Sequence, residues 1–312
     1  MFKNKNIFVA LTYKCNAFCK KCMTRYHVNR SVEMDEIVIS RLLELLKANN
    51  YTGIVSVGTG EPLLYHNLDL FIDGILNVSD TTRLRLLTNG MLLCEDNNPL
   101  IFNKRCKWGV TMDAFEQATL QGLQKGVDTE QVKHNVSAVA KKYGPEHLYL
   151  NFTVYQSNIE QILPFCKFAV DNGISEIYLT ELKVFKGYEK DLAAYRVIHD
   201  SKLDDIICEA KEFLVAHNID TRGINFGEKH YREKCYNKCI ASPVIDVDGM
   251  VSFCSGREDV YVGNILEQDI EDRWRKFAGR LNSCDSSWCN GCYDRMLADG
   301  NYLLPKTIRR EC

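Results

Sequence analysis

Apolar residues follow two alternating patterns along the first 217 residues of the chain. Short apolar runs between polar or glycine-containing segments predict buried strands, whereas longer segments with apolar residues three or four positions apart predict helices. The predicted strands are residues 7–11, 53–58, 83–88, 108–111, 148–154 and 176–180. The predicted helices are residues 34–50, 68–76, 129–142, 158–171 and 203–217.

Repeated strand–helix units predict an α/β fold with a parallel sheet and right-handed crossovers. Six predicted strands and about six helices are too few for an eight-stranded barrel, so we expect a partial (β/α)6 TIM-like barrel. In such barrels the chemistry gathers at the C-terminal ends of the strands. We expect residues 1–225 to form this barrel and residues 226–312 to form a small, cysteine-rich α+β domain.

The net charge and hydropathy of the chain bear on which binding partners are expected. The 312 residues carry a net charge of -2 with both signs interspersed, so neither a nucleic-acid surface nor a disordered acidic tract is expected. No apolar run has the length of a membrane span, and the first residues lack the features of a signal peptide, so a membrane partner is not expected.

The cysteine content points to metal chemistry. Fourteen cysteines without a secretion signal indicate the reducing cytoplasm, where thiols serve metals or catalysis rather than disulfides. Seven of the fourteen lie between Cys235 and Cys312. This uneven distribution predicts two metal centres on two domains.

Three cysteines form a C-x3-C-x2-C motif directly after the first predicted strand: Cys15, Cys19 and Cys22. Three thiolates on one short loop can bind three irons of a [4Fe–4S] cluster and leave the fourth iron open to a ligand. A structural zinc knuckle is the alternative. The spacing resembles the signature of radical S-adenosylmethionine (SAM) enzymes.

The second predicted strand ends at Gly58-Thr-Gly-Glu-Pro62. Glycine lets the backbone approach a ligand closely, and the Glu61 carboxylate could accept a charge-assisted hydrogen bond from an ammonium group. The run resembles the Gly-Gly-Glu-Pro element of radical SAM enzymes, which implies that Thr59, Gly60, Glu61 and Pro62 hold the amino group of SAM. An ordinary strand-to-helix turn is the alternative.

Two further turns resemble elements of the same family: Thr88-Asn-Gly90 and Thr111-Met-Asp113. The resemblance implies contacts to the ribose or carboxylate of SAM at Thr111, and also at Asn89 and Asn151. Each of these three residues could equally serve as a capping or turn residue.

Near the C-terminus, two cysteines flank an Asp-Gly hairpin and a C-x2-C pair follows, which resembles the SPASM and twitch domains of many radical SAM enzymes. The resemblance implies an auxiliary [4Fe–4S] cluster, with Ala298 standing where a longer SPASM domain would place a further cysteine. Zinc is the alternative occupant. The four expected ligands are Cys239, Cys254, Cys289 and Cys292.

Three neighbouring thiols remain: Cys235, Cys284 and Cys312. One of them could replace one of the four expected ligands. Cys235 and Cys284 are candidate hydrogen-atom donors to a substrate radical, or all three thiols are incidental.

The resemblance implies reductive cleavage of SAM to a 5′-deoxyadenosyl radical, with the electron supplied by a flavodoxin- or ferredoxin-type donor. We expect oxidation or epimerisation of a carbon centre in a small polar natural product, such as a sugar or aminocyclitol. One auxiliary cluster and the lack of an N-terminal extension for leader binding favour this substrate class. The alternatives are a peptide-modifying enzyme and, more remotely, a non-enzymatic iron–sulfur or zinc scaffold.

The two motifs predict the iron content. Anaerobically prepared protein should contain about eight irons, four for each cluster, and replacing Cys15, Cys19 and Cys22 together by Ala should leave about four. The triple variant should also lose SAM cleavage. Stoichiometric zinc at the C-terminal site after anaerobic reconstitution would contradict the auxiliary cluster.

Overall fold

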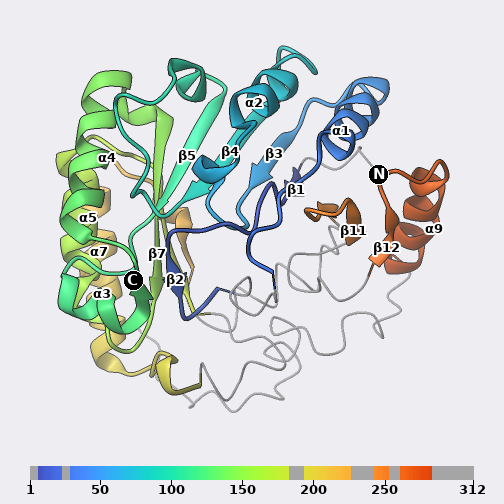
Figure 1. Ribbon diagram of the computed structural model, residues 1–312. Helices are drawn as coiled ribbons and strands as arrows, with labels where there is room; N and C mark the ends of the chain where they lie inside the picture. Colours follow the sequence, from blue (N-terminus) through green and yellow to red (C-terminus); the bar gives the residue numbers. More distant parts are fainter. Residues whose placement is uncertain (1–5, 23–28, 183–192, 226–241, 253–260, 283–312) are drawn as a thin grey trace.

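The computed structural model describes residues 6–22, 29–182, 193–225, 242–252 and 261–282 (Figure 1). These residues form a mixed α/β fold in which helices cover the outer side of a long, curved sheet (Figure 1). The opposite, concave side of the sheet faces the cysteine loop. This arrangement confirms the predicted partial TIM-like fold.

The sheet has the spatial order β12-β11-β10-β1-β3-β4-β5-β7-β8-β9. Each pair of neighbours from β10 through β1 to β9 is parallel, and only the pairs β10–β11 and β11–β12 are antiparallel. The parallel strands after β10 are β1 (Asn6–Val9), β3 (Ile54–Val57), β4 (Arg83–Thr88), β5 (Cys106–Thr111), β7 (Leu148–Val154), β8 (Ile177–Glu181) and β9 (Ile224–Asn225).

The helices begin and end close to the predicted bounds, because capping residues mark several of their starts. The Asp35 side chain accepts a hydrogen bond from the N–H of Ile37, and Asp128 accepts from the N–H groups of Glu130 and Gln131. The outer helices are α1 (Glu36–Ala48), α2 (Leu68–Leu76), α4 (Thr129–Tyr143), α5 (Ile162–Asp171) and α7 (Ser201–Ala216).

Strand β7 shows how alternation separates the core from the site. Leu148, Leu150 and Phe152 are completely buried on the helix-covered side of the sheet. Asn151 and Thr153 alternate with them and are only partly buried, so they face the concave side. The barrel therefore packs its apolar core between sheet and helices and keeps polar side chains on the inner surface.

The short elements that were not predicted include β2 (Phe18–Cys19), β6 (Gln124–Lys125) and helix α3 (Gln117–Leu123). Strands β2 and β6 pair with each other in a separate two-stranded sheet. A two-residue strand has no period to detect, and its partner lies over a hundred residues away in the chain. Only the folded barrel brings the two segments together.

The C-terminal hairpin is formed as predicted by β10 (Val244–Ile245) and β11 (Met250–Ser252), and Gly249 takes a φ of 81° in the turn. Strand β10 pairs with β1, and β12 (Tyr261–Asn264) and helix α9 (Ile270–Asn282) follow. The hydroxyl of Tyr13 donates to Asp246 Oδ1 at 2.5 Å, which ties the hairpin to the cysteine loop. The domain boundary after residue 225 stays a prediction.

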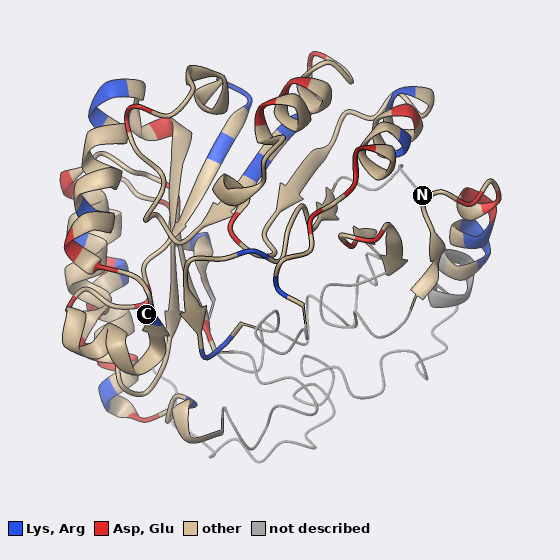
Figure 2. Cartoon of the chain, in the orientation of Figure 1, with Lys and Arg blue, Asp and Glu red and all other residues tan. Residues whose placement is uncertain are grey.

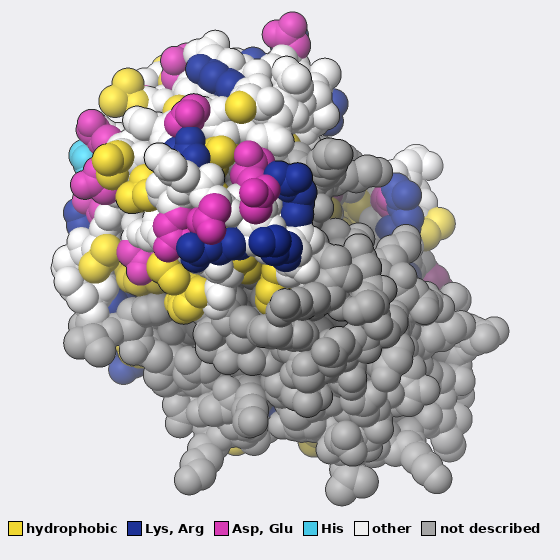
Figure 3. Space-filling view, turned by 90° about the vertical axis from the view of Figure 1, so that its right-hand side faces the viewer, with side chains coloured by type: hydrophobic (Ala, Val, Ile, Leu, Met, Phe, Trp, Pro, Cys, Tyr) yellow, Lys and Arg dark blue, Asp and Glu magenta, His cyan; other side chains and the backbone are white. Residues whose placement is uncertain are grey.

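Charges of both signs are interspersed over the described part of the face in Figure 3, in keeping with the small net charge. A search of the described helices finds none with the length and apolar character needed to cross a membrane.

Candidate functional site

The loop after β1 carries Cys15, Cys19 and Cys22, and all three thiols are partly buried. Burial raises the pKa of the Cys15 and Cys19 thiols, so these groups need nearby positive charge to act as thiolates. Within the described residues, no three Cys, His, Asp or Glu side chains converge on a point where one metal ion could bind. In a cubane cluster each thiolate binds a different iron, and the three cysteines of this loop would supply such a set of ligands.

The short β2–β6 sheet holds this loop from one side. Cys19 pairs directly with Gln124, and the N–H of Lys20 donates to the carbonyl of Leu123 at 2.9 Å. Gly126 has a φ of 81°, and a Cβ at this position would lie 2.4 Å from the carbonyl oxygen of Asn16. The segment around residue 125 therefore lies against the backbone of the cysteine loop.

The turn after β3 holds the loop from another side. Gly60 has a φ of 67°, and a Cβ there would lie 2.1 Å from the carbonyl oxygen of Thr12. The N–H of Glu61 donates to the carbonyl of Lys14 at 2.7 Å. Only glycine allows this approach, so the element that resembles Gly-Gly-Glu-Pro lies directly beside the cysteine loop.

The Glu61 carboxylate is completely buried and joins two turns. It accepts hydrogen bonds from the Thr88 hydroxyl at 2.9 and 3.0 Å, from the N–H of Asn89 at 3.0 Å and from the N–H of Leu63 at 3.3 Å. Burial raises the pKa of Glu61, and these hydrogen bonds partly oppose the rise. Both oxygens thus already have protein donors, and direct binding of an ammonium group by Glu61 stays a prediction.

Asn89 lies next to the first cysteine. Its Nδ2 donates to Asn16 Oδ1 at 2.7 Å and lies 3.9 Å from Cys15 Sγ, while its Oδ1 accepts from the N–H of Met91 at 3.0 Å. The side chain therefore makes the turn contact that the sequence allowed and also reaches the cysteine loop. A SAM contact at Asn89 stays a prediction.

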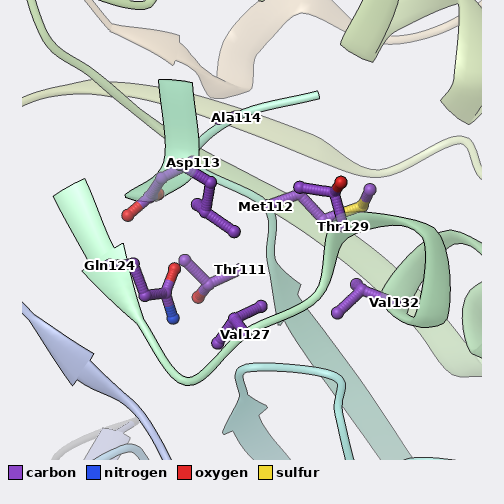
Figure 4. Close-up of a pocket in the computed structure, with 9 residues that line it drawn as sticks. Thr111, Met112, Asp113, Ala114, Gln124, Val127, Thr129 and Val132 are labelled. Atoms are coloured by element: carbon purple, nitrogen blue, oxygen red, sulfur yellow. The ribbon is translucent and has the colours of Figure 1, made fainter. Parts of the chain in front are cut away.

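Thr111 and Asn151 are brought together in register across β5 and β7. The Nδ2 atom of Asn151 is buried and has no hydrogen-bond partner among the described residues. Thr111 lines a small pocket together with Asp113 and Gln124 (Figure 4). Unpartnered buried donors are rare in folded proteins, so this pair suits a polar ligand on the concave side of the sheet.

Sequence reasoning missed a buried ion pair inside the cysteine motif. Lys21 Nζ lies 2.5 Å from Asp113 Oδ2 and donates to the Thr153 hydroxyl at 2.5 Å. Asp113 is almost completely buried, and its Oδ1 accepts from the N–H of Thr153 at 3.0 Å. Figure 2 shows basic positions along this loop. The ion pair connects the cysteine loop to the ends of β5 and β7, and only the fold brings its three members together.

The predicted residues of the second metal centre lie outside the described residues. They are Cys235, Cys239, Cys254, Cys284, Cys289, Cys292 and Cys312. The auxiliary cluster and the two hydrogen-atom donors therefore stay predictions.

A partial barrel with three cysteines on the loop after its first strand, and with three turns gathered around them, is the arrangement expected of a radical SAM enzyme. Residues 9–175, more than half of the chain, match the radical SAM superfamily. The chain belongs to this superfamily. The family implies SAM and a [4Fe–4S] cluster, and the three thiols, the close approach at Gly60 and the unpartnered Asn151 donor fit that pair.

Curated relatives match between about half and four fifths of the chain. A GTP 3′,8-cyclase from Lactiplantibacillus plantarum is 23% identical over 206 residues, which is 63% of this chain and 61% of that protein. A probable GTP 3′,8-cyclase from Sulfurisphaera tokodaii is 27% identical over 256 residues, 81% of this chain and 76% of that protein. The chain spans about three fifths of the length of the Lactiplantibacillus protein.

Solved structures share the fold over nearly the whole chain. SuiB from Streptococcus suis bound to S-adenosylmethionine has a TM-score of 0.70 at 15% identity, covering 99% of this chain and 76% of its own. The enzyme anSMEcpe, with bound AdoMet and a peptide, has a TM-score of 0.66 at 16% identity, covering 96% and 92%. These similarities confirm the fold.

When bound, the cluster and SAM supply a carbon-centred radical that abstracts hydrogen. The residues of this chain supply orientation: Cys15, Cys19 and Cys22 would hold the cluster, and the turn at Gly60 would bring backbone groups close to the ligand. Thr111 and Asn151 would orient the ligand on the concave surface. Two buried carboxylates, Glu61 and Asp113, hold these parts in place.

We expect that removing one partner of the Lys21–Asp113 ion pair destabilises the fold more than removing both. Lys21→Met leaves the buried Asp113 charge unpaired, and we expect the free energy of unfolding to fall by about 3 kcal/mol. The double variant Lys21→Met/Asp113→Asn should recover part of this loss. Urea denaturation of the cluster-free protein measures both.

A matched control is Lys14→Met in the same loop, because Lys14 pairs with Glu33 at 2.6 Å and is 40% exposed. Its effect should be small. Equal losses for Lys14→Met and Lys21→Met would contradict a special role for the buried pair.

Glu61→Gln separates a structural role from ligand binding. Either orientation of the new carboxamide points its NH2 at a backbone N–H, that of Leu63 or of Asn89, so we expect the free energy of unfolding to fall by about 1–3 kcal/mol. SAM affinity should also fall, roughly ten- to a hundred-fold, while the iron content is kept. Denaturation of the cluster-free protein and SAM titration of the cluster-loaded protein give the two values.

Glu44→Gln, at an exposed carboxylate on α1, is the control and should change neither value. Unchanged stability together with weakened SAM binding in Glu61→Gln would instead assign Glu61 to the ammonium group alone. Unchanged SAM affinity would show that the Gly58–Pro62 run is only a turn.

Proposed function

We propose that this radical SAM enzyme reductively cleaves SAM and uses the resulting 5′-deoxyadenosyl radical to abstract one hydrogen atom from a carbon of its substrate. The observation that supports this most strongly is the convergence of three turns on the cysteine loop, at Gly60, Asn89 and Asp113. A non-enzymatic scaffold would not need the buried donor of Asn151, which has no acceptor among the residues that the structure describes. The electron comes from a flavodoxin- or ferredoxin-type protein.

The first candidate substrate is a small polar molecule. The curated relatives are named for a reaction of GTP, which is a small polar molecule, and they match up to 81% of this chain. Polar side chains of Thr111, Asn151 and Thr153 on the concave surface suit a ligand with several hydroxyl or amide groups. The outcome is oxidation or epimerisation of one carbon.

The second candidate substrate is a peptide. SuiB has been solved with its precursor peptide SuiA, with a TM-score of 0.70 over 100% of this chain, and anSMEcpe with a bound peptide. The matches cover 100% and 96% of this chain. One barrel fold supports both substrate classes, so the substrate must be decided by assay.

In an oxidation, the substrate radical loses one electron to the proposed auxiliary cluster of Cys239, Cys254, Cys289 and Cys292, and one proton to solvent. In an epimerisation, a thiol returns a hydrogen atom from the opposite face, and the thiyl radical is then reduced by the same electron donor. Cys235 and Cys284 are the proposed thiols, with Cys235 slightly preferred.

Isotope uptake from heavy water distinguishes the two outcomes. Epimerisation should place one deuterium on the inverted carbon because thiols exchange with solvent, whereas oxidation should lower the product mass by two hydrogens. Mass spectrometry of products from sugar or aminocyclitol substrates and from candidate precursor peptides measures both. Absence of 5′-deoxyadenosine with reduced, cluster-loaded protein and SAM would contradict the proposed function itself.

A separate measurement identifies the thiol that donates the hydrogen atom. Replacing the true donor by Ala should stop epimer formation while 5′-deoxyadenosine still accumulates. If Cys235→Ala and Cys284→Ala both leave turnover and product unchanged, neither thiol is the donor.

A further inference from the structure

No sequence motif and no secondary-structure pattern singles out Gln124 as a functional residue. It lies in β6 directly opposite Cys19 of β2, in an antiparallel pair. Directly opposed residues of an antiparallel pair extend their side chains from the same face of the ladder. The Gln124 side chain therefore lies on the same side of this small sheet as the central cysteine of the cluster motif.

The Gln124 side chain is buried, but its carboxamide oxygen accepts no hydrogen bond from the described residues. Its exposed fraction is 2%, and its Oε1 atom has no hydrogen-bond donor among the described residues. Figure 4 shows the carboxamide beside Thr111 in the pocket that Asp113 and Thr129 also line. A buried acceptor without a donor is unfavourable, so the pocket is better satisfied when a ligand brings one.

The neighbouring strand offers the complementary group. Asn151 pairs with Thr111 in register, and its buried Nδ2 is a donor without a described acceptor. The inner surface thus presents an unpaired acceptor at Gln124, a hydroxyl at Thr111 and an unpaired donor at Asn151. A sugar hydroxyl both donates and accepts, and two adjacent hydroxyls satisfy all three side chains.

We propose that Gln124 binds a ribose hydroxyl of SAM and is a cofactor-binding residue of this enzyme. The proposal rests on the proposed function, because it requires SAM beside the cysteine loop. The methionine end of SAM is a poorer match, since an ammonium group only donates and a carboxylate only accepts, and neither satisfies the mixed set around Thr111.

The test compares SAM with its 2′,3′-dideoxy analogue on the unreduced, cluster-loaded protein, so that binding is measured without cleavage. In the wild type, SAM should bind more tightly than the analogue. Gln124→Leu should lose about three- to tenfold in affinity for SAM and little for the analogue, so that its preference for the diol largely disappears. Gln121→Leu, at an exposed glutamine of α3, is the matched control and should keep the preference.

A stability measurement excludes a merely structural role. Because Gln124 Oε1 has no hydrogen-bond donor in the described part of the chain, Gln124→Leu should leave the urea midpoint of the cluster-free protein unchanged or raise it. A lowered midpoint, or a Gln124→Leu variant that keeps the full preference for the diol, overturns the proposal. Equal loss of affinity for SAM and the analogue assigns Gln124 to another part of the ligand and also overturns it. Failure of the wild type to bind SAM at all would instead reject the proposed function.

Discussion

The site depends on the close approach of two backbone turns at the ends of neighbouring parallel strands. Strands β1 and β3 pair in parallel, so the loops that follow them leave the sheet at the same edge. Gly60 takes a positive φ against the carbonyl of Thr12, and the N–H of Glu61 bonds to the carbonyl of Lys14. The loop that carries the three cysteines thereby gains a fixed neighbour before any cluster is bound.

Two buried carboxylates hold the remaining turns in place. The unfavourable burial of each carboxylate is offset by a different kind of hydrogen-bond donor. Glu61 receives only neutral donors, from Thr88, Asn89 and Leu63, and joins the turns after β3 and β4. Asp113 receives the ammonium group of Lys21 and joins the cysteine loop to β5 and β7. Removing either carboxylate or its partners leaves buried polar groups unpaired, so both contribute to a preformed site. Preformed groups around a reactive intermediate limit side reactions and orient the substrate.

The concave surface and the cysteine loop have different expected roles. The loop and its supporting turns are the parts expected of any enzyme in this superfamily. The concave surface presents polar positions on β5 and β7, and Gln124 of β6 lies opposite Cys19. They bear on which ligand groups are recognised, whereas the barrel itself accommodates many reactions. The relatives illustrate this, because enzymes named for GTP and enzymes solved with peptides share the same architecture.

The sequence by itself determined the order of strands and helices, the cysteine motif and the glycine turns, because these depend on local periodicity, spacing and backbone conformation. It placed Cys15, Glu61, Asn89 and Asp113 after successive strands, and parallel pairing brings such positions to one edge. Only the tertiary structure decided which side chains meet. The ion pair of Lys21 with Asp113, the hydrogen bonds from Thr88 and Asn89 to Glu61 and the pairing of Gln124 with Cys19 join residues that lie 27 to 105 positions apart. No local sequence pattern predicts such contacts, because the partners of these buried groups come from other strands and turns.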